Sequence, residues 1–150
     1  MNRLLLLFTL FSATVSAQEV DTAKILRMYD NQTIVLEPSS NRYQRGRDMD
    51  DVGFFNQKMV GKLSGDEASA LILESSKRSR RGFWGAMGGA VVLAGATGLA
   101  SVSSPVAVIV ATGGIVWYIY SLNQLFSAED LLHQAIWHHN REVVKRAVAP

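Results

Sequence analysis

The fold of this chain is decided by residues 82–126, GFWGAMGGAVVLAGATGLASVSSPVAVIVATGGIVWYIYSLNQLF, a stretch without a charged side chain. Within it, residues 83–102 just reach the length of about 20 apolar residues that a helix needs to cross a bilayer. A second apolar segment covers residues 106–126, and Pro105 stands at the favoured first position of its helix. The polar break at 101–105 is so short that the two helices must be antiparallel neighbours. We therefore expect a transmembrane helical hairpin.

Composition separates the chain into two parts. Its 150 residues suit one domain, and most of the acids and bases lie in residues 18–81. The absence of cysteine excludes disulfides, thiol catalysis, cysteine-based zinc sites and lipidation of an N-terminal cysteine.

The net charge is only +2, but positive charge is concentrated just before the first span. This basic cluster consists of Lys77, Arg78, Arg80 and Arg81. A short basic run beside a long apolar segment is typical of a membrane surface. Since no extended basic face with interleaved aromatic residues accompanies it, we expect no nucleic-acid partner.

Small residues recur every four positions in both spans. In the first span they are Ala86, Ala90, Ala94 and Gly98, with Gly85 and Gly89 as a GxxxG pair beside them. In the second span they are Ser103, Ala107 and Ala111, followed by Gly113 and Gly114. This spacing lets two helix backbones approach closely in a membrane. We expect the two faces to pack on each other, with self-association or docking on a larger complex as the alternative.

Aromatic residues gather near one end of each span. Phe83 and Trp84 begin the first span, while Trp117, Tyr118 and Tyr120 lie late in the second. In an antiparallel hairpin these two ends lie on the same side, so the sequence predicts an aromatic belt at one membrane interface. A hairpin buried by protein would not need such a belt.

Residues 1–17, MNRLLLLFTLFSATVSA, have the three parts of a secretory signal peptide. Arg3 is the basic part, residues 4–11 form an apolar core too short to span comfortably, and Ala17 ends the small-residue cleavage site. We expect the mature chain to begin at Gln18, with an uncleaved anchor as the alternative.

Cleavage would place residues 18–63 and the C-terminus outside the cytoplasm, in the periplasm. The basic cluster would then also be outside, against the positive-inside tendency. We expect the signal peptide to determine the orientation despite the basic cluster. There are two alternatives: the hairpin inserts only shallowly, or residues 1–17 are not a signal peptide.

A small polar module is expected over residues 18–63. A short β-hairpin is predicted from residues 23–29 and 33–36 around an Asp-Asn turn, and residues 43–47 read as another extended piece or turn. From Asp50, apolar residues recur at helical spacing.

Two capping boxes follow this module. Ser64 to Glu67 predicts the start of a helix that runs unbroken through the basic cluster into the first span. Ser127 to Asp130 predicts a C-terminal amphipathic helix over residues 127–150. That helix would lie at the interface or pack back on residues 50–75, or it would directly extend the second span.

No catalytic, cofactor or metal motif is found. His133, His138 and His139 lack the i,i+3 or i,i+4 carboxylate-completed spacing of a metal site, so we interpret them as interfacial residues beside Trp137. The glycines of the first span follow no strand and no lysine completes a phosphate-binding loop. We expect no enzyme activity, no cofactor and no small-molecule substrate.

Several segments together resemble a loose group of small exported proteins of Bacteroidota. They are Tyr43-Gln44-Arg45-Gly46-Arg47, Glu67-Ala68 before Ser76-Lys77-Arg78, the two spans, and the ending Ala135-Ile136-Trp137-His138-His139-Asn140. This ending is similar to the group's AVxxYN motif, with His139 where Tyr is usual. The resemblance covers about two-thirds of the chain and implies an envelope protein of a Gram-negative bacterium, without an activity.

The sequence as a whole predicts a mainly α, non-enzymatic membrane protein of the cell envelope, with an anchoring or helix–helix interaction role. Its partners would be the lipid bilayer and a second copy or an envelope complex. Two alternatives are an oligomeric, glycine-rich pore or membrane-perturbing hairpin, and an accessory subunit of an envelope transport or secretion complex.

Overall fold

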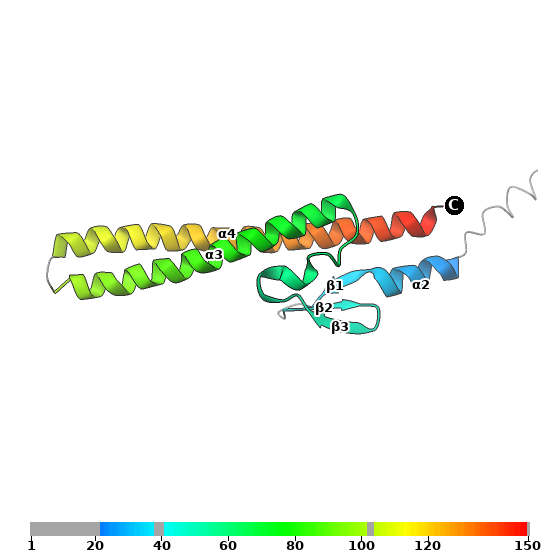
Figure 1. The fold of residues 1–150 in the computed structure, drawn as a ribbon, viewed down its shortest axis with the longest axis horizontal. Coiled ribbons are helices and arrows are strands. Elements are labelled where there is room, and N and C mark those ends of the chain that lie inside the picture. Colours follow the sequence, from blue (N-terminus) through cyan, green and yellow to red (C-terminus); the bar gives the residue numbers. More distant parts are fainter. Residues whose placement is uncertain (1–21, 38–40, 102–103, 150) are drawn as a thin grey trace, which may run out of the picture.

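The computed structural model describes residues 22–37, 41–101 and 104–149. Two long antiparallel helices, α3 (Asp66–Leu99) and α4 (Ser104–Val148), form a helical hairpin, as the sequence predicts (Figure 1). A small module packs beside the half of this hairpin that carries the C-terminus, while the connected end extends away from it. The predicted signal peptide lies outside the described residues.

The module consists of one helix, three short strands and a 3-10 helix. These elements are α2 (Thr22–Gln32), β1 (Ile34–Leu36), β2 (Arg42–Arg45), β3 (Asp48–Asp51) and η1 (Phe54–Met59). The strands form one antiparallel sheet in the order β1-β2-β3, with Ile34 opposite Arg45 and Arg42 opposite Asp51. The predicted extended piece at residues 43–47 is therefore confirmed as most of β2 and the turn after it.

The predicted β-hairpin around the Asp-Asn turn is wrong, because residues 22–32 form a helix. Most residues of this segment are good helix formers, and Ile25, Met28 and Gln32, at helical spacing, are its half-buried side chains. Only the β-branched run after it becomes a strand. At the junction, the Thr33 amide and hydroxyl both donate hydrogen bonds to the Tyr29 carbonyl, at 3.0 and 2.6 Å, and end the helix.

The helix predicted from Asp50 is also wrong, because residues 48–51 pair with β2 and a short 3-10 helix follows. Of the apolar residues at that spacing, Val52 and Met59 are buried in the core, Phe55 is half-buried and Val60 is exposed. Gly53 at φ 83° breaks the chain direction between strand and 3-10 helix. Strand pairing and this glycine therefore overrode a helical spacing of apolar residues.

The first capping box does not form. Helix α3 begins at Asp66 after Gly65, which has φ 100° and no side chain to cap it, and Ser64 bonds to His139 instead. The expected continuity is confirmed, since α3 runs without a break from Asp66 through the basic cluster to Leu99.

Helix α4 has no start at Ser127, so the second capping box is wrong as well. Residues 127–148 directly extend the second span and at the same time contribute to the core of the module. That core comprises Ile34, Tyr43, Val52, Met59, Leu63, Ala68, Ile72, Leu132, Ala135 and Ile136. Residues 22–63 therefore pack against the start of α3 and the C-terminal half of α4, and they do not enclose a core by themselves.

Small residues line the contact between the long helices, and they recur every seven positions. On α3 they are Ala68, Ser75, Gly82, Gly89 and Ala96. On α4 they are Ala107, Gly114, Ser121, Ala128 and Ala135. A seven-residue repeat keeps one face of each helix against its partner as the two wind slightly around each other. This line of contact, the seam, thus runs both through the half of the hairpin beside the module and through its apolar half, residues 83–126.

Candidate functional site: the apolar hairpin and its junction with the module

The helices approach most closely at glycines of the seam. A Cβ atom on Gly82 would lie 2.8 Å from the backbone carbonyl oxygen of Ser121. On Gly89 it would lie 3.2 Å from the Tyr118 backbone nitrogen, and on Gly114 it would lie 3.1 Å from the Val92 side chain. A larger residue at Gly82 or Gly89 would therefore push against the backbone of the partner helix.

The predicted packing residues divide into two groups. Gly89, Ala107 and Gly114 are buried in the seam, while Gly85, Ala86 and Ala111 are half-buried at its edges. In contrast, Ala90, Ala94 and Gly98 are exposed. A four-residue repeat drifts away from a seven-residue seam, so the predicted stripe that begins at Ala86 leaves the contact from Ala90 onward. Gly82 and Ala96 were missed; the seven-residue spacing was the signal that would have found them.

The outward faces of the apolar half carry large hydrophobic side chains. The exposed set includes Val91, Val106, Val108, Ile109, Ile115, Val116 and Ile119. Ile109 is 72% exposed, whereas the residues between the helices are glycine, alanine and serine. This distribution is the reverse of a water-soluble hairpin, in which large apolar residues fill the contact and polar ones cover the outside.

The aromatic residues of the two spans lie at one level of the hairpin. A Cβ on Gly88 of α3 would lie 3.6 Å from the ring of Trp117 on α4. Trp84, Trp117 and Tyr120 are at least half-exposed, and Phe83 and Tyr118 are half-buried. The side chains predicted as interface anchors are thus gathered at the end of the apolar half nearest the module.

The basic cluster lies one to two turns before this aromatic level. Lys77, Arg80 and Arg81 are exposed and form no ion pair within the described part of the chain. Arg78 is half-buried and its guanidinium lies 3.0 Å from the Glu74 carboxylate. The hydrogen bond from Arg78 holds the pKa of Glu74 below its usual value. Three cations are therefore free for an external anion.

His139 joins the hairpin to the module and is not interfacial as predicted. Its side chain is 1% exposed. The Ser64 amide donates a hydrogen bond to its Nδ1 at 2.9 Å. Because Nδ1 is the acceptor, the proton of the neutral ring is on Nε2, which donates to the Gln32 carbonyl at 3.0 Å. Burial, the largest cause, lowers the pKa of this imidazole and keeps it neutral.

Asn140 makes a second connection beside His139. The Ile34 amide donates to its side-chain oxygen at 2.8 Å, and its side-chain nitrogen donates to the Ile34 carbonyl at 2.9 Å. The Asn140 amide thus occupies the place of a neighbouring strand at this residue of β1. The consecutive His-Asn pair holds the backbone where α2 passes into β1.

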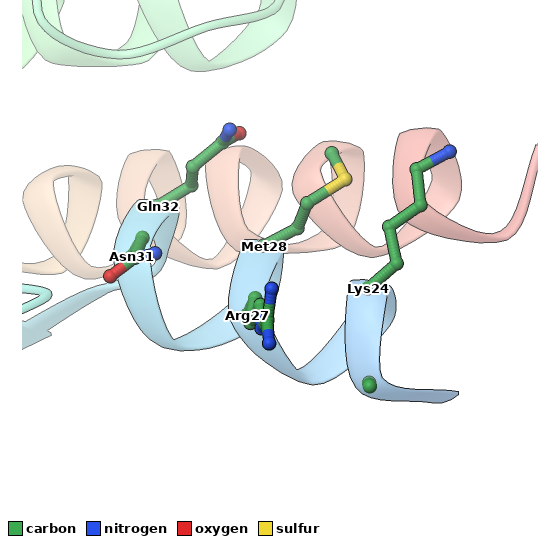
Figure 2. Close-up of a pocket in the computed structure, with 6 residues that line it drawn as sticks. Lys24, Arg27, Met28, Asn31 and Gln32 are labelled. Carbon is green, nitrogen blue, oxygen red and sulfur yellow. The ribbon is translucent and has the colours of Figure 1, made fainter. Parts of the chain in front are cut away.

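The module also carries hollows on its surface. Figure 2 shows an open one of about 500 Å³ on α2, where Lys24, Met28 and Gln32 point toward α4 and Arg27 and Asn31 point elsewhere. Its described lining contains neither a carboxylate nor a histidine. Among the described residues, no three His, Asp or Glu side chains are placed to hold a metal ion. The hollow therefore gives no indication of a metal site.

No protein family, curated protein or solved structure matches this chain. Its class follows from the molecule itself: a mainly helical protein in which a small three-stranded module is docked on a long helical hairpin. Both hairpin helices are long and apolar enough to be candidate membrane spans.

Proposed function

We propose that this chain is a non-enzymatic integral membrane protein of a cell envelope, in which the apolar hairpin anchors the small module at the bilayer surface. The observation that carries the proposal is the inside-out distribution of side chains in residues 83–126. Small residues fill the helix contact and large apolar residues, such as Ile109 and Val116, point outward. Moving each such side chain from water into an apolar environment stabilises the protein by about 1.5–3 kcal/mol. Lipid would provide this environment along the whole length of residues 83–126.

The dimensions support the same proposal. Residues 83–99 of α3 extend about 26 Å at about 1.5 Å per residue, close to the roughly 30 Å thickness of a hydrocarbon core. The module and the basic cluster lie beyond the aromatic level at one end, and no described element packs on the other end (Figure 1). A bilayer around the apolar half would leave the module in water.

The envelope location is proposed from the signal-peptide pattern of residues 1–17 and from the resemblance to small exported proteins of Bacteroidota. On this proposal the module lies in the periplasm and the connection between the spans lies in the cytoplasm.

Cysteine accessibility tests both parts of the proposal, because the chain has no native cysteine. We expect Ser69→Cys, on the exposed start of α3, to react with a membrane-impermeant maleimide in intact cells. Ser101→Cys, at the connection, should react only after lysis. The reverse pattern would contradict the periplasmic module, and release of the protein by alkaline carbonate would contradict the integral anchor.

A second role, helix association, is favoured by the exposed small residues. Ala90, Ala94 and Gly98 lie outside the hairpin contact, and a Cβ on Gly95 or Gly98 would meet no other atom within 4 Å. This stripe suits a second copy or an envelope complex. Oxidative crosslinking of Ala94→Cys in membranes should give dimers if the partner is a second copy, and Val108→Cys is an exposed control.

A pore receives less support. The hydroxyl groups of Thr97, Ser101 and Thr112 each donate to a carbonyl of their own helix, at 2.6 to 2.8 Å. They therefore need no water-filled lumen for hydrogen bonding. Leakage of dye from vesicles containing the purified protein would favour the pore over the anchor.

A further inference from the structure

We infer that the turn at residues 53–56 is a second membrane contact, in which Phe54 and Phe55 insert at the surface of an anionic bilayer beside Phe83 and Trp84. The inference rests on the proposed membrane anchor and adds a contact made by the module. The sequence does not indicate this contact, because Phe54 and Phe55 lie far along the chain from Phe83 and Trp84.

Four aromatic rings from separate parts of the chain form one cluster. The ring centroids of Phe54 and Phe55 lie 4.4 Å apart. Their distances from the ring centroid of Phe83 are 5.5 and 5.4 Å, respectively. The ring of Trp84 lies 5.4 Å from that of Phe83. Since Phe83 and Trp84 open the first candidate span, the turn holds its rings at the level where that span enters the bilayer.

The cluster is not a hydrophobic core. Phe54 is 67% exposed and Trp84 is 61% exposed, although each touches another ring. A turn that served only to pack the module against α3 would bury these rings. Exposed aromatic rings at this level are the residues that membrane interfaces favour.

The backbone of the turn is strained in a way that presents the rings. Phe55 and Asn56 both have positive φ, 56° and 60°, which is rare for residues other than glycine and is an outlier for a bulky ring. Such strain persists only where surrounding structure enforces it, and it gathers at functional positions.

A hydrogen-bond chain enforces this conformation. The Asn56 side chain donates to the Ser75 hydroxyl at 2.8 Å, and that hydroxyl donates to the Ala128 carbonyl of α4 at 2.6 Å. Ser75 is fully buried in the seam. Both long helices therefore hold the turn in place, and the rings are fixed relative to the span.

Charge indicates which bilayer surface fits. Arg80 precedes Phe83 by three residues and so lies on the same side of α3. Arg80, Lys77 and Arg81 are exposed and without an ion pair among the described residues. Of the carboxylates near these cations, Asp51 is 3.4 Å from Lys58 and Glu74 is 3.0 Å from Arg78, whereas Glu129, which lines a hollow with Asn56 and Ser79, has no ion pair among the described residues. Unpaired cations beside aromatic rings match anionic lipid headgroups.

Lipid quenching of a fluorophore tests the inference. An environment-sensitive fluorophore would be attached to the cysteine of the Phe54→Cys variant of the full chain. The labelled protein would then be reconstituted in vesicles of phosphatidylcholine and phosphatidylglycerol that carry brominated acyl chains. Gln57→Cys would carry it in a second variant that keeps both phenylalanines. Met49→Cys on β3, a 55% exposed position of the same module, is the matched control, and Ile109→Cys marks the hairpin.

We expect strong quenching at position 109 and at least twofold more quenching at positions 54 and 57 than at 49. Quenching at 54 should fall when phosphatidylglycerol is omitted or when Lys77 and Arg80 are both replaced by glutamine. If 109 is quenched but 54 and 57 behave like 49, the anchor stands and this inference is wrong. Equal quenching at 54 in neutral vesicles would overturn the choice of an anionic surface. Absence of quenching at 109 would overturn the membrane anchor itself.

Discussion

His139 and Asn140 are the two residues on which the attachment of the module most depends. Each satisfies backbone groups at the α2–β1 junction, and these groups would otherwise be partly buried without partners. The sequence marks the pair only as part of a motif-like ending. The structure supplies the chemical reason: one side chain binds the Gln32 carbonyl and the next binds both backbone groups of Ile34.

The module should lose stability on acidification through His139. The pKa of this imidazole is lowered by burial, so the unfolded chain binds the proton more readily. The contribution is complete above the unfolded value of about 6.5 and is lost as the pH falls through the lower folded value. Thermal unfolding in detergent micelles at pH 7.5, 6.5 and 5.5 would measure it.

The comparison is best made in a His138→Gln background, because His138 is a second histidine beside the module and its Nδ1 lies 2.9 Å from the Glu67 carboxylate. His139→Gln should flatten the pH dependence, whereas the exposed control His133→Gln should leave it. An unchanged slope in His139→Gln would show that another group is responsible.

Asn140→Ala should destabilise the docked module by about 1–3 kcal/mol, because it removes both hydrogen bonds to Ile34. Hydrogen exchange should become faster at the amides of β1, and less so in the middle of α3. Gln134→Ala, an exposed position on the same helix, is the control and should change neither. Equal exchange in both variants would contradict a docking role for Asn140.

At the scale of elements, the main feature is the seven-residue seam shared by α3 and α4. It explains why α3 has a buried small residue at every seventh position from Ala68 to Ala96, both beside the module and in the apolar part of the hairpin. It also explains why neighbouring small residues differ: Gly89 meets the Tyr118 backbone, and Ala94 faces outward.

Gly89→Leu should therefore destabilise the hairpin by about 1–3 kcal/mol, since its side chain would collide with the α4 backbone. Ala94→Leu should leave the hairpin intact, although the four-residue spacing predicts Ala94 as a packing residue too. Steric trapping or thermal unfolding in micelles would compare them. Equal destabilisation by the two variants would contradict the seam.

At the scale of the whole molecule, the hydrophobic core and the candidate spans are separate. The buried core cluster is drawn from residues 34–72 and 132–136, outside the apolar stretch 83–126. The same two helices thus serve as part of a folded module at one end and as a candidate anchor at the other.

This separation predicts that the module folds without the anchor. A chain of residues 18–81 and 128–149 joined by a short flexible linker should be soluble, helical and cooperative in thermal unfolding. Introducing His139→Ala into this chain should weaken or abolish the transition. A parent chain that aggregates or shows no transition would mean that the module needs the apolar half or the lipid.

The sequence by itself determined the hairpin, the continuity of α3 through the basic cluster and the placement of aromatic residues at one end. These features follow from uninterrupted apolarity and a short break, which are local properties of residues 82–126. It also indicated the strand around Tyr43, where local composition and pairing agree.

Only the tertiary structure decided the rest. Residues 48–51 became a strand because pairing with β2 outweighed the helical spacing of the apolar residues, and the helix at residues 22–32 packs on α4 and does not pair with β1. Ser64 does not cap α3, because its hydroxyl contacts His139 and Arg146, which lie 75 and 82 residues further along the chain. The seam, the His-Asn junction and the cluster of Phe54 with Phe83 all join residues far apart in the chain, so their energies depend on distances that local sequence does not contain.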